Sequence, residues 1–285
     1  MYEIDKIISA IDYLPPVSGT TPKILSITED PDSKISDLVD LIKYDQAMTA
    51  NILKICNSAY FGLPKKINTL EQAINYLGKN QVAELVFMKS MAKNLRKEQK
   101  GYCLCEGELW KYSISSAIIA KELAKEFSIK DSSLIFTAAL IKDIGKVILD
   151  KYVENSFKQI MGNVLKNGCT FIEAEKKIIG IDHAELGGLV AEKWNFSDKM
   201  IHIIRYHHLS EQTGGEDIET SIVYMADILC MMMGMGVGSD GLAYKFYKDV
   251  AEKLNLSENI LMNVMLGFMA NLKQVEDLAG NIIGS

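Results

Sequence analysis

The chain has 285 residues, of which 48% are hydrophobic and 24% are charged, and this composition is typical of a globular protein and excludes extensive disorder. Its 31 Lys and Arg residues against 37 Asp and Glu residues give a net charge of −6, which excludes a globally cationic nucleic-acid-binding protein. At roughly 150 residues per domain, the length predicts one large domain or two smaller ones.

The first residues and the cysteines favour a cytoplasmic protein. The start, Met1 to Lys6, lacks the basic and apolar regions of an export signal, and the five scattered cysteines are typical of reduced thiols. The segment 221–238 is the strongest membrane candidate, but it carries Asp227 near its middle. A carboxylate at the centre of a bilayer costs roughly 2.5–3.5 kcal/mol, so we expect a buried core helix and no membrane insertion.

Helical signals run along the whole chain and predict an all-α fold. All five prolines lie within the first 64 residues, and the rest of the chain has the apolar spacing of amphipathic helices. Helix starts are marked at Thr69, Thr170 and Asp182, and glycines at 78 and 180 mark helix ends. In chain order, the predicted helices cover residues 2–13, 21–28, 34–43, 46–57, 70–77, 80–95, 107–127, 131–150, 153–167, 171–179, 183–194, 198–208, 218–233, 240–253 and 258–276.

A polar stretch interrupts this pattern between Lys97 and Glu106 and is the best candidate for a linker. It divides the chain into a smaller N-terminal helical lobe, residues 1–100, and a larger helical domain, residues 101–285. We therefore expect a two-lobed helical protein.

Candidate site residues concentrate in the larger domain. His183 opens a predicted helix, His207 and His208 end the next one, and Asp143 and Asp227 lie in apolar helical surroundings. A buried carboxylate needs a partner or a metal ion, so facing helices could build one site from these side chains. Each residue also has a purely structural explanation: a helix-cap neighbour for His183, complements to the helix dipole for the paired histidines, and a lysine-paired core acid for Asp227.

The order of these residues resembles the HD superfamily of metal-dependent phosphohydrolases, and most closely its HDOD branch. The resemblance extends into the N-terminal lobe, which contains no acid–base pair or nucleophile and is similar to a packing and interaction module. The segments that carry it there are Leu14-Pro15-Pro16, Asp37 to Asp45, Asn57 to Gly62 and Thr69 to Gly78.

Members of this superfamily with an intact site hold one or more metal ions, and a metal-bound hydroxide attacks a phosphate ester. The resemblance matches Asp143 to the Asp of the His-Asp pair and His183 to a later histidine. It matches His207 and His208 to the paired histidines, and Asp227 to the last carboxylate. The Gly-Tyr-Pro segment that marks the related HD-GYP branch is absent after His208.

Two expected metal ligands are replaced. Tyr112 stands where the resemblance places the early histidine, and Lys142 stands where it places the His of the His-Asp pair. An ammonium about 4 Å from a divalent ion is repelled by roughly 8 kcal/mol at an effective dielectric constant near 20. We therefore expect Lys142 to supply positive charge to Asp143 or Asp227 in place of the metal, which makes the five remaining ligand positions vestigial.

These features predict a non-catalytic HDOD signalling or regulatory protein that has no cofactor and no catalytic residue. We expect it to bind a signalling protein, with a nucleotide as a second candidate ligand and no nucleic acid. The alternative is a metal-dependent phosphohydrolase that holds Zn, Fe or Mn with the reduced ligand set. Lys146 is either a phosphate contact or, by the simpler interpretation, a solvated lysine at a helix end.

Overall fold

The computed structural model describes residues 4–14, 23–24, 26–27, 30, 32–58, 60–129, 132–209, 217–236, 238–270 and 272–283. These residues form helices and no strand, which confirms the predicted all-α fold. The helices are α1 (Ile4–Ser9), η1 (Ala10–Tyr13), α3 (Ile35–Ile42), α4 (Gln46–Cys56), α5 (Leu70–Leu77), α6 (Lys79–Leu95), η2 (Lys100–Tyr102), α7 (Glu108–Glu126), α8 (Ser133–Ile141), α9 (Ile144–Asn167), α10 (Phe171–Ile179), α11 (His183–Lys193), α12 (Asp198–Tyr206), α13 (Ile218–Met232), η3 (Ser239–Ala243), α14 (Lys248–Lys253), α15 (Glu258–Ala270) and α16 (Leu272–Ile283).

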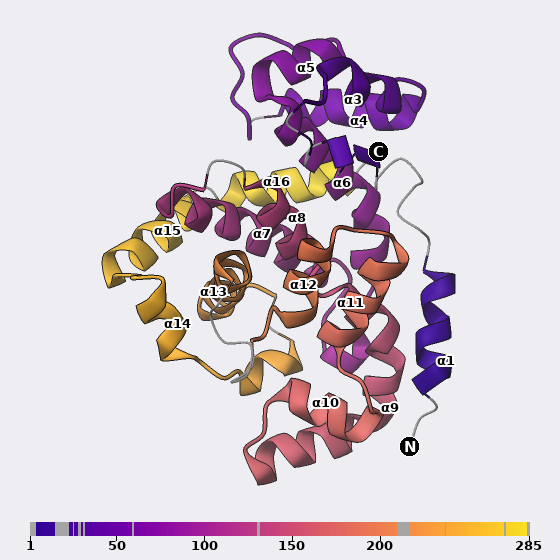
Figure 1. Cartoon of the computed structure of the whole chain (residues 1–285), viewed down its shortest axis with the longest axis vertical. Coiled ribbons are helices and arrows are strands. Elements are labelled where there is room, and N and C mark those ends of the chain that lie inside the picture. Colours follow the sequence, from indigo (N-terminus) through magenta and orange to yellow (C-terminus); the bar gives the residue numbers. More distant parts are fainter. Residues whose placement is uncertain are drawn as a thin grey trace.

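The helices form a small cluster at one end of the molecule and a larger body below it. Helices α3, α4 and α5 make up the small cluster, and α6 runs from this cluster into the body (Figure 1). Helix α13 lies at the centre of the body, where α7, α8 and α12 pack around it. Since α13 is buried along most of its length, its side chains are held in a closely packed and water-poor environment.

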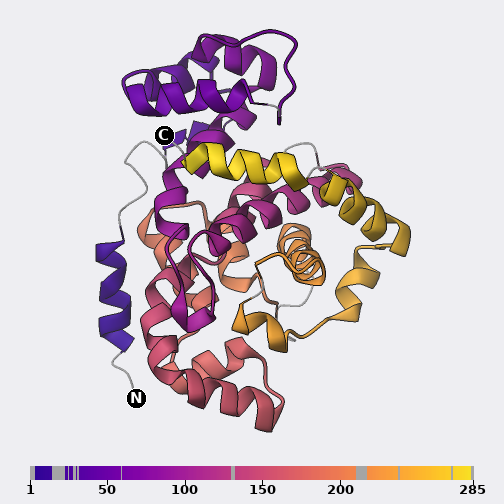
Figure 2. The same ribbon diagram turned by 180° about the vertical axis from the view of Figure 1, so that it is seen from behind.

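Elements at both ends of the chain pack across the predicted boundary between the lobes. Helix α16 lies between the small cluster and the body and packs against α4, α6 and α7, as the rear view in Figure 2 shows. At the other end of the chain, α1 runs along the body, and Asp12 just after it forms an ion pair with Lys193 of α11. The predicted boundary near residue 100 therefore has elements packed across it and stays a prediction.

The polar stretch at 97–106 is folded against the body and is not an extended linker. Its short helix η2 packs on α9, Gly101 and Tyr102 are buried, and Gln99 and Leu104 form an isolated β-bridge. The backbone N–H of Gly101 donates to Asp150 at 2.7 Å. Composition marked this stretch as polar, but Tyr102 anchors it in the core.

Local cap signals are confirmed. The side chains of Thr69, Thr170 and Asp182 accept hydrogen bonds from backbone N–H groups in the first turns of α5, α10 and α11. Gly78 and Gly180 have φ values of +87° and +102°, the backbone region that favours glycine at a helix end.

Several predicted helix boundaries are wrong. The predicted helix 131–150 ends at Ile141, and a new helix begins at Ile144 and continues unbroken through 150–153 to Asn167. The predicted helices 240–253 and 258–276 are each divided in two. The predicted helix 21–28 lies partly outside the described residues. No proline or glycine marks the break after Ile141, so tertiary packing decides where it falls.

None of the described helices combines the length and the apolar character that a membrane crossing requires.

Candidate functional site

The junction between α8 and α9 places Lys142 and Asp143 in the centre of the body. The residues are adjacent in sequence and are 0% and 1% exposed, respectively. Asp143 occupies the N-cap position of α9, but its carboxylate makes no capping hydrogen bond. Gly145, two residues later, approaches the backbone of α11 so closely that a Cβ would lie 2.0 Å from the carbonyl oxygen of His183. This contact fixes the junction against the histidine-bearing helix.

Lys142 bridges the two buried aspartates of the predicted metal site. Its Nζ forms ion pairs with Asp143 Oδ2 and with Asp227 Oδ1, the latter at 2.8 Å. Asp143 comes from the α8–α9 junction and Asp227 from the middle of α13, so the ammonium joins two separate elements. A buried charge is tolerated when it is paired and hydrogen-bonded in this way.

Tyr112 of α7 completes the surroundings of this ammonium. Its hydroxyl donates to Asp227 Oδ1 at 2.6 Å, and Lys142 Nζ lies 4.5 Å from the centre of its ring. The ring face carries negative charge density and attracts a cation, while the hydroxyl satisfies the neighbouring carboxylate. Tyr112 therefore supports the lysine in two ways.

Lys146 is also part of this network. Its Nζ lies 2.8 Å from Asp143 Oδ1 and 2.6 Å from Asp240 Oδ2, and the residue is only 3% exposed. The interpretation of Lys146 as a solvated lysine at a helix end is therefore wrong. Its ammonium is held between two carboxylates, and the phosphate contact stays a prediction.

The charges of this network stabilise one another. Burial disfavours an ionised Asp143, but Lys142 and Lys146 outweigh burial and hold its pKa well below the usual range. The pKa of Asp227 is lowered as well, because Lys142 outweighs the cost of burial. Burial likewise opposes the charge of Lys142, but the two carboxylates raise its pKa. Both acids and the lysine therefore stay charged at neutral pH.

His183 is positioned by a buried glutamate on the preceding helix. Gly180 ends α10 with a positive φ, and Asp182 caps α11, so the two helices meet at a tight turn. This turn brings Glu175 Oε2 within 2.7 Å of His183 Nδ1, and Glu175 also accepts from the Tyr102 hydroxyl at 2.5 Å. Glu175 outweighs the cost of burial and raises the pKa of His183.

A chain of hydrogen bonds connects His183 with Asp227. His183 Nε2 lies 2.8 Å from His208 Nε2, His208 Nδ1 lies 2.5 Å from the Tyr244 hydroxyl, and that hydroxyl donates to Asp227 Oδ2. Because Asp227 is ionised, Tyr244 donates to it and must accept from His208 Nδ1–H. His208 Nε2 then has only a lone pair, so His183 donates to it from Nε2.

This assignment makes His183 a doubly protonated imidazolium and His208 a neutral imidazole. The pKa values agree with it, because burial and the neighbouring histidines His207 and His183 lower the pKa of His208 well below its ordinary value, while that of His183 is raised. The ionised Asp227 orders the donors along this chain, and Glu175 stabilises the charged His183 at its other end.

His207 faces the same centre from the end of α12. Its Nδ1 donates to the carbonyl of Ile204 at 2.7 Å, so Nε2 has a lone pair. That nitrogen lies 3.9 Å from Asp143 Oδ1 and has no hydrogen-bond partner among the described residues. Burial lowers the pKa of His207 to about 4 and keeps the ring neutral.

The structure brings the predicted ligand positions together. Asp143, His183, His207 and His208 each offer a ligand atom within 4.8 Å of the others, and this group could hold a metal ion. Asp227 is not part of this group; it is linked to Asp143 through Lys142 Nζ, which also lies against the Tyr112 ring. Sequence reasoning missed Glu175, Asp240 and Tyr244. Glu175 lies on the buried face of a capped helix and could have been noticed, whereas Asp240 and Tyr244 lie where the sequence predicts a single helix, 240–253, which the structure divides.

The contacts already made within this group compete with a divalent ion. Both oxygens of Asp143 already contact ammonium groups, one from Lys142 and one from Lys146. In the assignment above, His183 Nε2 carries the proton and donates it to the lone pair of His208 Nε2. Neither nitrogen then has a lone pair free for a metal ion. Among the Nε2 atoms of the three histidines, that of His207 has a lone pair and no partner among the described residues, so it can still act as a ligand.

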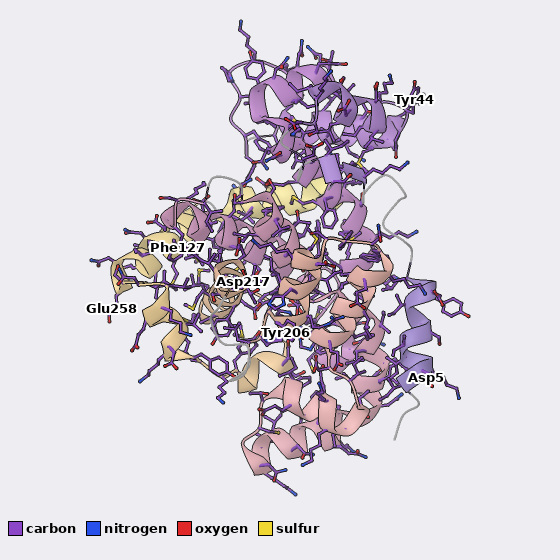
Figure 3. The ribbon with its side chains drawn as sticks, in the orientation of Figure 1. Asp5, Tyr44, Phe127, Tyr206, Asp217 and Glu258 are labelled. Carbon is purple, nitrogen blue, oxygen red and sulfur yellow. The ribbon has the colours of Figure 1, made fainter. Side chains whose placement is uncertain are left out.

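A cavity of about 690 Å³ opens above the histidines. His183, His208 and Tyr244 form part of its wall, and Tyr206, labelled in Figure 3, lies on the wall at the end of α12. The wall also carries charged side chains of both signs, among them Lys176, Arg205, Lys245, Glu173 and Glu185. His183, His208, Tyr244 and Asp240 thus connect the buried network of Lys142 to an accessible, amphipathic cavity.

The sequence pattern of the HDOD domain matches residues 14–210. Two solved structures are similar over nearly the whole chain: an HDOD domain protein of unknown function from Geobacter sulfurreducens, with a TM-score of 0.75 and 21% identity over 98% of this chain and 99% of that one; and a proposed phosphohydrolase from Shewanella amazonensis, with a TM-score of 0.71 and 20% identity over 97% of each chain.

Two longer proteins are also similar. A proposed signal transduction protein from Marinobacter aquaeolei has a TM-score of 0.74 and 17% identity over 99% of this chain and 62% of its own. An uncharacterised protein of Treponema pallidum is 28% identical over 214 residues, which are 70% of this chain and 38% of that protein. The chain thus spans well under half the length of that curated relative.

Proposed function

Because the chain belongs to the HDOD domain family, we propose that it is a non-catalytic signalling or regulatory protein of the cytoplasm that acts by binding a protein partner. The observation that carries this proposal is the position of Lys142 Nζ between Asp143 and Asp227. A fixed ammonium there supplies positive charge at a place where relatives with an intact site use a metal. The charge network then serves stability and the arrangement of the helices, and not phosphate hydrolysis.

The same network supports a regulatory role. It joins α7, the α8–α9 junction, α11, α13 and η3 through buried charges, so a ligand in the cavity above would act on several elements at once. Aromatic and charged groups on the wall, such as Phe171, Tyr206 and Lys176, suit a nucleotide as a second ligand. The division into lobes 1–100 and 101–285 is part of this proposal.

One observation favours the alternative, a metal-dependent phosphohydrolase with a reduced ligand set. His207 Nε2 is buried, carries a lone pair and has no partner among the described residues. The two buried lysines that contact Asp143 are the stronger observation, and they argue against a metal. Each repels a divalent ion, and displacement of either one deprives a buried carboxylate of that partner.

The test compares the wild-type protein with the variant Tyr112→His/Lys142→His. Both are loaded with Zn²⁺, Mn²⁺ or Fe²⁺, dialysed, analysed for bound metal and assayed with bis-p-nitrophenyl phosphate. We expect less than stoichiometric metal and no turnover in the wild type, and a gain of bound metal in the variant. Stoichiometric metal in the wild type, with turnover that Asp143→Ala abolishes, contradicts the proposal.

A further inference from the structure

A basic groove lies on the C-terminal half of α6, away from the residues discussed above. We name it the α6 groove; it has a volume of about 520 Å³ and is lined by Lys89, Ala92, Lys93, Arg96, Lys97, Glu98 and Glu106. Four of these side chains are cations and two are anions. The groove therefore has an excess of positive charge on a chain whose net charge is −6.

The ion pairs of the two groove acids do not involve Lys93 or Lys97. Glu106 lies 3.2 Å from Arg96, and Glu98 lies 3.9 Å from Lys100 outside the groove. Lys93 and Lys97 are exposed, and their ammonium groups form no ion pair with the described residues. Lys89 is half-buried, and burial, with the nearby Lys54, lowers its pKa.

The three lysines follow one line. Lys89, Lys93 and Lys97 are spaced four residues apart, so they lie on the same face of α6 and its C-terminal turn. Four residues of helix advance about 6 Å, which equals about two residues of an extended peptide at roughly 3.3 Å each. A peptide with an acidic residue at every second position would place one carboxylate opposite each lysine.

We propose that the α6 groove binds an extended acidic segment of a partner protein, with alternate Asp or Glu side chains paired to Lys89, Lys93 and Lys97. Charge complementarity of this kind guides encounter and fixes register. A nucleic acid is disfavoured because no aromatic side chain lines the groove for base stacking and the chain as a whole is acidic.

The position of the groove gives such binding a consequence. Helix α6 packs against α4 and α5 of the small cluster and against α7, α8 and α9 of the body. A segment bound on α6 therefore contacts the element that joins the two parts of the molecule. This inference names the partner-facing surface of the proposed binding function and rests on that function.

The experiment measures fluorescence anisotropy of a fluorescein-labelled (Glu-Ser)4 peptide with the full chain, at 50 mM and 500 mM NaCl. The comparison probes are (Gln-Ser)4 and the oligonucleotide dT12. We expect the wild type to bind (Glu-Ser)4 at low salt, more weakly at high salt, and to bind (Gln-Ser)4 and dT12 much more weakly.

Paired variants identify the surface. Lys93→Gln/Lys97→Gln should weaken binding about tenfold, while Lys93→Arg/Lys97→Arg should keep the wild-type affinity. The matched control Lys151→Gln/Lys158→Gln removes two exposed lysines of α9 and should change affinity less than about twofold.

Three results overturn the proposal: no binding of (Glu-Ser)4 at low salt, equal affinity in the Gln variant of α6, or equally tight binding of dT12. None of these results changes the outcome of the metal-binding and hydrolysis test of Lys142. A failure of the groove is therefore separable from a failure of the non-catalytic assignment.

Discussion

Lys142 Nζ lies 4.5 Å from the centre of the Tyr112 ring, so the residues at the two replaced ligand positions contact each other. The aromatic face stabilises the ammonium, and the hydroxyl of Tyr112 donates to the carboxylate that this ammonium also contacts. The two replacements thus act together, and either one alone would leave Asp227 with one partner fewer. Because the two side chains depend on each other, they are better explained as a rebuilt charge network than as a metal site that has only lost ligands.

Removal of the ammonium should destabilise the fold strongly. In Lys142→Met, Asp143 and Asp227 lose a shared buried partner, and breaking a buried ion pair from one side costs about 3–5 kcal/mol. Urea unfolding followed by circular dichroism measures this loss. Lys151→Met, on the exposed surface of α9, is the control and should change the free energy of unfolding by less than about 0.5 kcal/mol. A loss below about 1 kcal/mol in Lys142→Met contradicts the account.

The hydrogen-bond chain predicts the protonation of two histidines. In ¹⁵N spectra at pH 6, His183 should carry protons on both ring nitrogens, and His208 should be neutral with its proton on Nδ1. Glu175→Gln removes the charge that raises the pKa of His183, so this pKa should fall, and His183→Gln identifies its resonances. A His183 titration that is the same with and without Glu175 is incompatible with the contact between these two side chains.

His207 should make the protein sensitive to mild acid. Its pKa is about 4 in the folded state, because of burial, and about 6.5 in the unfolded chain. Between these values the unfolded state binds more protons, so the free energy of unfolding decreases as the pH falls from 6.5. His207→Asn cannot titrate there and should lose about 2 kcal/mol less than the wild type between pH 7 and pH 5.

The contribution of His183 to the free energy of unfolding changes with pH in the opposite direction. Its folded pKa is raised, so its stabilising contribution is present below about pH 6.5 and decreases as the pH rises through the folded value. Urea unfolding curves of His207→Asn and the wild type, each measured from pH 5 to pH 8, separate the two effects. Parallel pH profiles for the two proteins would show that His207 is not held neutral.

Two glycines of α9 should respond in opposite directions to alanine. A Cβ on Gly145 would lie 2.0 Å from the His183 carbonyl oxygen, whereas a Cβ on Gly162 meets nothing within 4 Å. Gly145→Ala should therefore destabilise the protein by about 1–3 kcal/mol or more, and Gly162→Ala should stabilise it by about 0.5–1 kcal/mol. Thermal unfolding of both variants tests this difference, and a neutral Gly145→Ala would show that α9 and α11 are not packed so closely.

The elements that local chemistry determines could be predicted from the sequence. The cap of α10 illustrates this, because Thr170 and Glu173 form their reciprocal hydrogen bonds within four residues of chain. The break between α8 and α9 could not be predicted in this way. It falls at Lys142 and Asp143, with no proline or glycine at either position, because contacts with α11 and α13 decide it.

In the candidate site, too, some residues could be predicted from the sequence and others could not. The ligand positions Asp143, His183, His207 and His208 could be predicted from their order in the chain, and the structure brings them together. The partners that give each group its charge state come from distant elements without a local signal. Tyr244, for example, lies beyond α13 in an irregular segment, yet it relays the charge of Asp227 to His208.

The most direct measurement is a crystal structure of the wild-type protein soaked in Mn²⁺, with anomalous differences collected at the manganese edge. A side-chain amine should be seen bridging the carboxylates of the α8–α9 junction and α13, with no anomalous peak among them. A strong peak bound by Asp143 and the histidines, with Lys142 rotated out of the core, would contradict the central claim.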